Sequence, residues 1–461
     1  YSVLHNRRFL DEECGNSRIK PVDMCVFTDS LPFKLTDGQQ NAISDIEHDL
    51  ISDRAMNRLV QGDVGCGKTV VAEAAIFHAI SAGWQAAFMA PTEILARQHF
   101  SKLSMELGKF GMRTVLLVSG LKAAERREIL EDIKNGDVDV VVGTHALIQA
   151  DVKFAKLGLV ITDEQHRFGV NHRKVLAEKA EVVNVLVMSA TPIPRTLAAT
   201  VFGDMDFSVI RSKPSNRKEI ITRYATEKSR ERAYANVYNE VKNGNRAYIV
   251  APSIEDSEDS DLTSAEALFD EIRTKFKGLK VGLIHGKLDK SEKERIMNEF
   301  ASGAIEILVS TVVIEVGIDV PEATVIVIEN AERFGLAQLH QLRGRVGRSD
   351  LQSYCYLICY SESENAISRM NAMVTMNDGF QISEEDYRLR GAGDLMGTMQ
   401  HGYSGNSFYD LFGYDKILKL ATADAELIVS KNQSEIKSFV DMEQLQLRTN
   451  NIMVQDNSNI I

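Results

Sequence analysis

The stretch QGDVGCGKT has the residue types and spacing of a phosphate-binding loop. It fits the pattern GxxxxGK[ST], with Gly62 and Gly67 as its glycines and Lys68 and Thr69 at its end. Glycines here, Gly65 among them, let the backbone curl so that successive amides face an anion. We predict that Lys68 neutralises the β- and γ-phosphates of ATP and that Thr69 binds Mg²⁺. A chance glycine-rich turn is the alternative, and the flanking strand and helix patterns disfavour it.

A second stretch, LVITDEQH, ends an apolar run in two adjacent carboxylates, Asp163 and Glu164. A solvated strand end is the simpler explanation of an isolated acidic pair. Downstream of a phosphate loop, however, the pair suits phosphoryl transfer, in which one carboxylate supports the metal and a neighbouring residue activates water. We predict that Asp163 holds Mg²⁺ through its water shell and that Glu164 acts as the base or positions the water.

Two residues upstream of the loop have the chemistry to bind the base of the nucleotide. Gln39 offers a donor and an acceptor together, which suits the edge of adenine. Phe33 could stack on the ring, although a phenylalanine that packs under a helix is common. Their place just before the phosphate-loop strand favours the binding role.

The stretch HQLRGRVGRS holds Arg343, Arg345 and Arg348 close together. A solvated helix face is one explanation, but the interspersed glycines lower helix propensity and allow close backbone approach, which suits a contact surface. An arginine supplied by a second domain often stabilises the charge that develops in phosphoryl transfer. We predict that Arg345 and Arg348, with Gln341, face ATP across a cleft, so that nucleotide closes two domains and hydrolysis releases them.

These residues require a scaffold of buried strands, and the sequence supplies two sets. NRLVQ, QAAFMAP, RTVLLVSG, VDVVVGT, LGLVITDE and NVLVMSAT alternate with helical patterns, and RAYIVAP, KVGLIHG, IEILVST, ATVIVIEN and SYCYLICY repeat the arrangement. Continuous apolar strands indicate mostly parallel sheets covered on both faces. We expect an α/β fold of two lobes in tandem. We expect residues 1–30 to form a linker or the remnant of an upstream domain. Residues 31–212 and 213–365 should form the two lobes, and residues 366–461 a helical hairpin and tail.

Composition limits the classes of protein that need consideration. The chain has 461 residues and a net charge of −12, so any contact with nucleic acid must come from a local basic or amide-lined track. It has no apolar run of the ~18 residues that a membrane helix needs and no signal-peptide pattern, which predicts a cytoplasmic protein. Its five cysteines lack the paired spacing of a zinc site. Because the chain begins at Tyr1, we expect a fragment of a longer protein.

The series GDVGCGKT, APTEILARQH, VGTHALI, DEQH, MSATPIPRTLA, STVVIEVGIDVP and QLHQLRGRVGRS resembles the ordered motifs of superfamily 2 helicases. Longer stretches, DEQHRFGV, ENAERFGLAQLHQLRGRVGRS and NDGFQISEEDYRLRGAGDLMGTMQHG, are similar to the RecG family of DNA translocases. The resemblance covers residues from about 31 to 402. It implies two RecA-like domains, ATP and Mg²⁺ as ligands, and branched double-stranded DNA as substrate.

The resemblance also implies roles for individual residues. Gly317 and Asp319 match a motif near the nucleotide cleft, and Ser189 and Thr191 match the motif that couples hydrolysis to movement. Five further residues match motifs that line the nucleic-acid track: Pro91, Thr92, Thr144, His145 and Thr311.

The stretch RLRGAGDLMGTMQ resembles the translocation motif that joins the motor to a hook in RecG and in the transcription-repair coupling factor. The resemblance implies that Arg390 and Gln400 transmit movement of the lobes to the duplex. Most family members have proline where Ala392 stands and arginine where Met399 stands. Because Met399 lacks the positive charge of that arginine, the force on the duplex would be weaker or transmitted by different contacts.

We therefore expect an ATP-dependent translocase that acts on forks and Holliday junctions in repair and recombination. Residues 1–30 could not fold as the wedge domain of the RecG family, so we expect the motor portion of a longer protein or a divergent member with a reduced front end. The expected state is a monomer, with single-strand-binding protein as a second partner. A transcription-coupling translocase and a nucleotide-gated DNA clamp without turnover are the alternatives.

Overall fold

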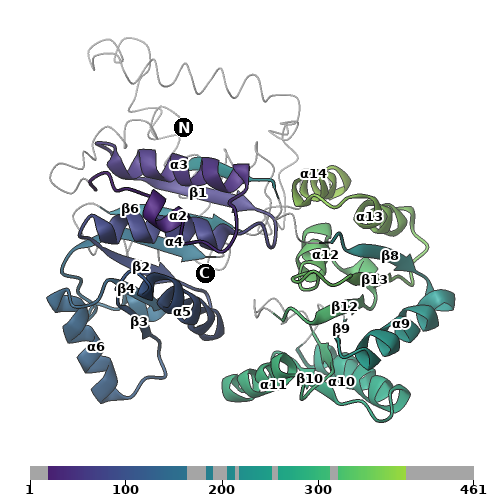
Figure 1. Cartoon of the computed structure of the whole chain (residues 1–461). Coiled ribbons are helices and arrows are strands. Elements are labelled where there is room, and N and C mark those ends of the chain that lie inside the picture. The colour runs from purple at the N-terminus through teal and green to yellow at the C-terminus, as the bar shows by residue number, and fades with distance from the viewer. Residues whose placement is uncertain are drawn as a thin grey trace, which may run out of the picture.

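The computed structural model describes residues 19–163, 183–189, 205–212, 218–251, 258–311 and 320–390. They form two α/β lobes, which Figure 1 shows as one lobe that is mostly purple to blue and a second that is teal to green. Each lobe is built on a sheet in which every described pairing is parallel. Helices cover the sheets, so the strands are buried on both faces, as the continuous apolar runs predict. The expected tandem α/β fold is confirmed.

The sheet of lobe 1 has seven strands in the order β3-β4-β2-β5-β6-β1-β7. Its strands are β1 (Asn57–Gly62), β2 (Gln85–Met89), β3 (Thr114–Leu117), β4 (Val140–Gly143), β5 (Leu157–Asp163), β6 (Asn184–Ser189) and β7 (Asp206–Ile210). Because all of them run in one direction, their carboxyl ends meet at one edge, where ligands bind in open α/β sheets.

The helices of lobe 1 connect these strands. They are α2 (Cys25–Thr28), α3 (Asp37–Ile51), α4 (Lys68–Ser81), α5 (Glu93–Gly108) and α6 (Ala123–Asn135), with a 3₁₀ turn η2 (His145–Ile148). α4 is apolar nearly all round, and each of its residues from 70 to 79 is buried. This matches a helix that lies between the sheet and other helices rather than on the surface. α5 starts at the carboxyl end of β2, and Thr92 caps it by accepting from the Leu95 amide at 3.4 Å.

The sheet of lobe 2 has six strands in the order β10-β11-β9-β12-β13-β8. The strands are β8 (Ile221–Ala225), β9 (Arg246–Val250), β10 (Val281–Ile284), β11 (Ile307–Ser310), β12 (Ala323–Ile328) and β13 (Tyr354–Ile358). The helices are α9 (Arg230–Lys242), α10 (Glu258–Lys275), α11 (Lys290–Ser302) and α12 (Leu336–Arg343), with 3₁₀ turns η4 (Glu227–Ser229) and η6 (Ala331–Arg333). Cys355 and Cys359 are buried in its core, as small apolar residues would be.

Two strands, β7 and β8, were not expected from the sequence. Both are edge strands of their sheets. In each, buried residues are interrupted by exposed or half-buried ones, so neither has the continuous apolar run of a central strand. The boundary between the lobes, expected between residues 212 and 213, lies after β7, which ends at Ile210, and before β8, which begins at Ile221.

The segment from Ile19 to residue 30 packs on lobe 1. Ile19 and Phe27 are buried in the core of that lobe, and the Phe27 ring lies 5.4 Å from the Phe77 ring. His78 of α4 donates from Nε2 to the carbonyl oxygen of Lys20 at 3.0 Å. The boundary expected after residue 30 therefore does not separate this segment from the lobe 1 core.

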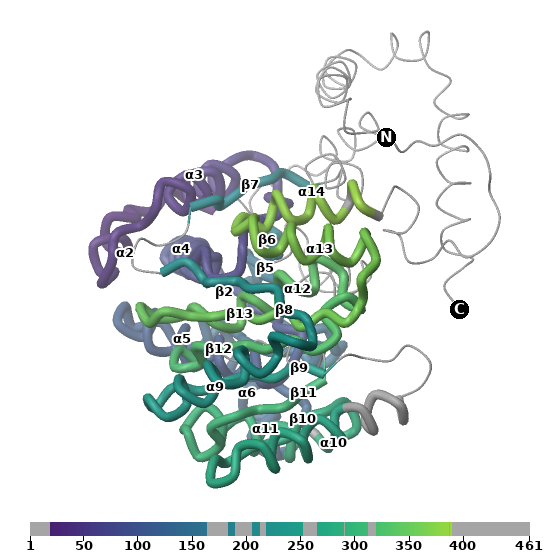
Figure 2. The backbone as a smooth tube through the Cα atoms, turned by 90° about the vertical axis from the view of Figure 1, so that its right-hand side faces the viewer, coloured from purple at the N-terminus to yellow at the C-terminus, as the bar shows by residue number. Residues whose placement is uncertain are grey.

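After β13 the chain forms two helices, α13 (Glu364–Thr375) and α14 (Gly379–Arg390), close to where a helical tail was expected. Figures 1 and 2 both show them beside α12. Asp386 of α14 accepts from the Leu336 amide at 3.3 Å, so α14 caps the start of α12. The described tail is thus fastened to the segment that carries the predicted arginines.

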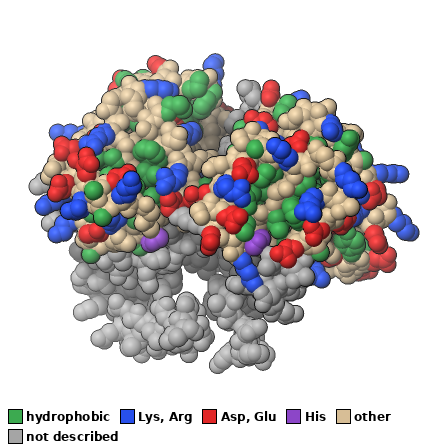
Figure 3. Space-filling model, turned by 90° about the horizontal axis from the view of Figure 1, so that it is seen from below, with side chains coloured by type: hydrophobic (Ala, Val, Ile, Leu, Met, Phe, Trp, Pro, Cys, Tyr) green, Lys and Arg blue, Asp and Glu red, His purple; other side chains and the backbone are tan. Residues whose placement is uncertain are grey.

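The surface is mixed in charge, as a net charge of −12 with interspersed lysines and arginines would suggest. Figure 3 shows acidic and basic side chains interspersed over both lobes on the face that it presents. Among the helices that the structure describes, none is both long and apolar enough to cross a membrane.

Candidate nucleotide site between the lobes

The predicted phosphate loop lies between β1 and α4, at the carboxyl edge of the lobe 1 sheet. Gly65 and Gly67 have φ of 78° and 86°, a backbone region that side chains other than glycine rarely adopt. The Lys68 ammonium donates to the carbonyl oxygens of Gly62 at 2.7 Å and Asp63 at 3.0 Å. The loop therefore curls around a cation at the start of a helix, which is an arrangement that binds phosphate.

Gln39 has a structural role that the sequence did not indicate. Its Oε1 accepts from the Thr36 amide at 2.9 Å, and its Nε2 donates to the Cys66 carbonyl oxygen at 2.9 Å. The side chain is buried, and a Cβ added to Gly67 would lie 2.2 Å from Nε2. Gln39 thus caps α3 and holds the phosphate loop at once. Recognition of adenine by Gln39 stays a prediction, as does stacking by Phe33, which is 52% exposed.

Asp163 ends β5, and Gly62 ends β1, two strands away. Asp163 pairs in register with Met188 of β6, which pairs with Val60 of β1 on its other side. At ~4.8 Å per strand, the backbone of Asp163 lies roughly 10 Å from β1. His99 of α5 holds the Asp163 carboxylate, with 2.9 Å between His99 Nε2 and Asp163 Oδ2.

The side chains present fit Mg²⁺ and a nucleotide phosphate. Thr69, half-buried in the first turn of α4, and Asp163 supply a hydroxyl and a carboxylate, which are the oxygen donors that Mg²⁺ prefers. Lys68 and the amides of the loop supply the positive side of a phosphate cradle. A Cβ added to Gly62 would lie 2.4 Å from Cys66 Sγ, so the loop closes tightly upon itself without room for larger residues.

The residues expected along a nucleic-acid track lie at the same sheet edges. Pro91 and Thr92 follow β2, while Thr144 and His145 follow the neighbouring β4. The two turns are joined by a bond of 2.8 Å from the Ala90 amide to the Gly143 carbonyl oxygen. Thr144 is buried and His145 is exposed. In lobe 2, Thr311 is buried directly after β11.

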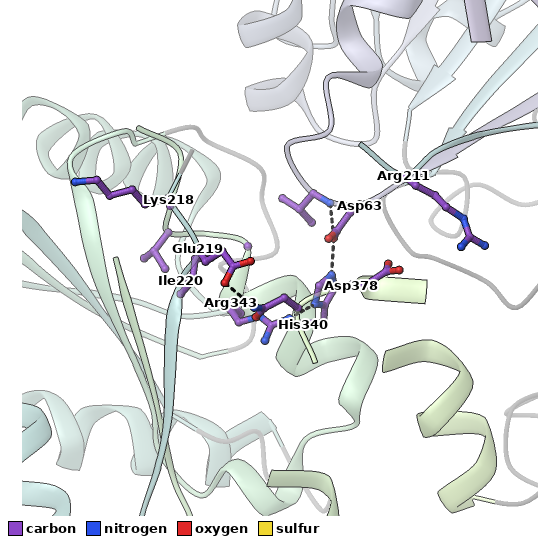
Figure 4. A pocket seen from close by; sticks show the side chains of 13 residues that line it. Asp63, Arg211, Lys218, Glu219, Ile220, His340, Arg343 and Asp378 are labelled. Atoms are coloured by element: carbon purple, nitrogen blue, oxygen red, sulfur yellow. Dashed lines mark hydrogen bonds and ion pairs between the residues drawn. The ribbon is translucent and has the colours of Figure 1, made fainter. Parts of the chain in front are cut away.

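The arginine segment, residues 336–348, comprises α12 and the residues that follow it, and it meets the phosphate loop across the lobes. His340 Nε2 lies 2.5 Å from Asp63 Oδ1, and both side chains are buried. A Cβ added to Gly344 would lie 2.8 Å from Cβ of Val64, so Gly344 packs directly on the loop. Figure 4 shows Asp63 approaching His340 from the opposite lobe. Lobe 2 therefore contacts the loop itself.

Arg343 extends this contact into the tail. One terminal nitrogen lies 2.9 Å from His340 Nδ1, and the other donates to the carbonyl oxygens of Met373 at 2.8 Å and Met376 at 2.9 Å. Since a guanidinium only donates, His340 Nδ1 accepts and His340 Nε2 carries the hydrogen that Asp63 receives. Burial lowers the pKa of Arg343. Residues Asp63, His340 and Arg343 thus form a chain from the phosphate loop to α13.

The predicted arginines stand in this same segment. Arg345 follows Gly344 and is 8% exposed. Arg348 donates from Nε to the Gly344 carbonyl oxygen at 3.1 Å, and Gln341 is half-buried on α12. The structure therefore places Gly344, the residue before Arg345, against the phosphate loop. A direct contact of Arg345 or Arg348 with ATP stays a prediction.

A cavity of about 450 Å³ opens beside the contact between the lobes. Asp63 and Val64 line it from lobe 1, and His340 and Arg343 line it from lobe 2. Figure 4 shows Arg211 on the other side, where its guanidinium lies 5.3 Å from the centre of the Phe380 ring of α14.

Several predicted residues lie outside what the structure describes. They are Glu164, Thr191, Gly317, Asp319 and Gln400. Arg390 is described only as the last residue of α14. Ser189 is described, buried at the end of β6 between the strands that carry Asp163 and the phosphate loop. The roles expected for all of these residues stay predictions.

The sequence did not indicate the contacts made by four residues of this site: Asp63, His340, Arg343 and His99. Asp63 and His340 carried a signal, because each is a polar residue inside a segment already expected at the cleft. Their pairing depends on how the lobes face each other, which a single sequence does not show.

Comparison with known proteins agrees with this geometry. The DEAD/DEAH box helicase model matches residues 36–200, the helicase conserved C-terminal domain matches residues 211–350, and the C-terminal part of RecG domain 3 matches residues 376–456. The fold and the site define the motor of a superfamily 2 helicase. The third match and the relatives below narrow the class, and the chain belongs to the RecG family of ATP-dependent DNA helicases.

Relatives support the assignment over most of the chain. The RecG of Thermotoga maritima is 49% identical over 87% of this chain and 52% of its own length. The RecG of Streptococcus pneumoniae is 48% identical over 87% of this chain and 60% of its own. A RecG structure bound to a three-way DNA junction has a TM-score of 0.75 and 44% identity over 91% of this chain and 56% of that one. The chain thus spans between half and two thirds of these relatives.

Proposed function

We propose that this chain is an ATP-driven translocase of branched duplex DNA, which regresses forks and moves Holliday junctions in repair and recombination. The contact between Asp63 and His340 is the observation that carries the proposal, since it places the arginine segment of lobe 2 on the phosphate loop of lobe 1. Hydrolysis in such a seam is inseparable from movement of the lobes. The RecG relatives and the RecG bound to a three-way junction support the choice of substrate.

The residues of the chain have distinct tasks in this proposal. The loop amides and Lys68 bind the phosphates of ATP, and Glu164 takes the proton of the attacking water or positions that water. Arg345 and Arg348 stabilise the negative charge that develops on the transferred phosphoryl group. Thr69 and Asp163 hold Mg²⁺, which neutralises phosphate charge when it is bound.

The track of the proposal follows the carboxyl edges of both sheets. Pro91, Thr92, Thr144 and His145 of lobe 1 and Thr311 of lobe 2 would contact phosphates through hydroxyl groups and amides. Such contacts position a protein on DNA without requiring a basic surface, which is compatible with a net charge of −12. Nucleotide-driven closure would then shift one set of contacts along the duplex relative to the other.

The tail would convert this shift into a push on the duplex. Arg343 holds the end of α13, and Asp386 of α14 caps α12, so the tail helices move with the arginine segment. We infer that Arg390 and Gln400 pass this movement to the DNA. The same proposal includes a monomeric state, a cytoplasmic location and contact with single-strand-binding protein.

The test is the ATPase rate of the chain on a fork-shaped duplex, a linear duplex and a single strand. We expect DNA to stimulate hydrolysis, most strongly with the fork. Lys68→Ala should lower the rate about 100-fold or more, because the phosphates lose their cation. Equal turnover in Lys68→Ala would refute the proposal.

Two other outcomes would favour the alternatives. Nucleotide binding without hydrolysis on any of the three DNAs would support a nucleotide-gated clamp. Linear duplex that stimulates as strongly as the fork, together with retention of RNA polymerase in a pull-down with the chain, would support a transcription-coupling translocase.

A further inference from the structure

α5 carries two side chains that contact the elements of the proposed metal site. His99 Nε2 lies 2.9 Å from Asp163 Oδ2 at the end of β5. Lys102, almost one turn further along α5, forms an ion pair of 3.0 Å with Glu73 of α4. Neither pair is needed to bind phosphate, so their position calls for another explanation.

The second pair connects α5 to the helix that carries Thr69. Glu73 lies four residues after Thr69, so the two side chains project from the same face of α4. The Glu73 side chain is 3% exposed, and burial raises its pKa while Lys102 opposes that shift. A buried carboxylate that keeps a partner at this distance holds α4 and α5 together, because separation would leave a buried charge alone.

The first pair restrains the metal-binding carboxylate itself. An ionised carboxylate only accepts hydrogen bonds, so His99 Nε2 carries the hydrogen. The His99 ring also lies 4.5 Å from the Phe88 ring at an interplanar angle of 44°, and its side chain is 12% exposed. Packing therefore limits rotation of the imidazole, and the imidazole limits rotation of the Asp163 carboxylate.

α5 begins directly after two of the residues that we propose to contact DNA. Pro91 and Thr92 lie just before its first residue, and the Thr92 hydroxyl caps it. His99 lies seven residues after Thr92, which is roughly 10 Å along the helix. A shift of the start of α5 on contact with a phosphate would therefore reach His99 through a rigid element.

We propose that His99 is a positioning residue that orients Asp163 for Mg²⁺, and that α5 thereby transmits DNA contact at its start to the metal site. The ion pair of Lys102 and Glu73 joins α5 to α4, so that Thr69 on α4 moves together with α5. This inference rests on the proposed nucleotide site and adds the route by which bound DNA changes the Mg²⁺ affinity of that site. Partners of metal-binding side chains typically change metal affinity by about 10- to 100-fold when they are removed.

The experiment measures binding rather than turnover. A fluorescent ADP analogue is titrated with Mg²⁺ in the presence of the full chain, with and without a labelled linear duplex whose own binding is followed by anisotropy. Three chains are compared: wild type, His99→Phe, which keeps the ring packing and loses the donor, and His99→Gln, which keeps a donor near Nε2. His48→Gln, at an exposed position of α3, is the matched control.

For the wild type, we expect DNA to lower the Mg²⁺ midpoint of nucleotide binding. His99→Phe should raise that midpoint about 10-fold or more and lose the effect of DNA, whereas His99→Gln and His48→Gln should behave as the wild type. A DNA effect of wild-type size in His99→Phe would overturn the inference, as would a wild type whose midpoint DNA does not change. In both cases the proposed function would stand.

Failure of the proposed function gives a different pattern. A wild-type chain that shows no Mg²⁺-dependent nucleotide binding, or no binding of the labelled duplex, would contradict the nucleotide or DNA site itself. If His99→Phe does not fold, the double variant Glu73→Gln, Lys102→Gln tests the ion pair that joins α5 to α4. We expect it to reduce the DNA effect in the same direction, and a full DNA effect would contradict the role of α5.

Discussion

His340 of lobe 2 donates through Nε2 to Asp63 of the lobe 1 phosphate loop, with 2.5 Å between nitrogen and oxygen. The direction of this bond follows from Arg343, which occupies the other ring nitrogen and only donates. A neutral imidazole therefore links a buried carboxylate of the nucleotide loop to a buried guanidinium of the tail interface. This chain of hydrogen bonds joins the phosphate loop of lobe 1 to the end of α13.

The link predicts energetic coupling between its ends. Asp63→Ala and His340→Ala should each reduce kcat/KM for DNA-stimulated ATP hydrolysis, and the double variant should lose less than the sum. We expect a coupling free energy of about 1–3 kcal/mol, typical of side chains in one buried network. Additive losses, measured under identical salt and DNA concentrations, would show that the two residues act separately.

Arg343 should anchor the tail through its geometry rather than its charge alone. Arg343→Lys keeps the charge but cannot reach His340, Met373 and Met376 together, so the end of α13 should loosen. We expect faster hydrogen exchange at residues 373–377 and a lower melting temperature. Arg388→Lys is the control, because that arginine is 71% exposed and pairs only with nearby Glu385 in what is described. Equal exchange in both variants would argue against an anchor.

Two glycines separate the cost of backbone strain from the cost of a lost contact. Gly67 and Gly83 have nearly equal φ, 86° and 85°, but an added Cβ meets Gln39 only at Gly67 and nothing within 4 Å at Gly83. Gly83→Ala should cost about 1 kcal/mol through strain and leave nucleotide binding intact. Gly67→Ala should in addition displace Gln39 and abolish nucleotide binding. Similar nucleotide affinity in the two variants would contradict the role given to Gln39.

His78 should make the stability of lobe 1 depend on pH. Burial lowers its pKa in the folded chain, and its Nε2 donates to Lys20. The unfolded chain therefore takes up a proton first as pH falls below about 6.5, so stability is lost from there down to the lowered folded pKa. His78→Gln keeps a donor without titrating. Its melting temperature should fall less than that of the wild type between about pH 8 and about pH 5, and parallel curves would be evidence against this assignment.

Much of the site could be predicted from short stretches, because the chemistry depends on local backbone. The phosphate loop needs adjacent glycines and a lysine at a helix start, and those are neighbours in sequence. The central strands were also predictable, since burial on both faces leaves a continuous apolar run. β7 and β8 were not, because edge strands bury one face and their mixed composition resembles a loop.

The contacts that the sequence did not show are those between distant segments. Gln39 has the side chain to bind a base, but its amide is engaged by Thr36 and Cys66, and only the fold brings Cys66 to it. His99 and Asp163 are 64 residues apart and meet because α5 packs beside the end of β5. Asp63 and His340 are 277 residues apart and depend on the approach of the lobes.

We propose that ATP is hydrolysed in a seam between the phosphate loop of one lobe and the arginines of the other. The most direct measurement is the DNA-stimulated turnover and nucleotide affinity of Arg345→Ala, beside Lys68→Ala. We predict that Arg345→Ala still binds nucleotide but turns over about 10³-fold more slowly, whereas Lys68→Ala loses both. Turnover of Arg345→Ala at the wild-type rate would contradict the claim.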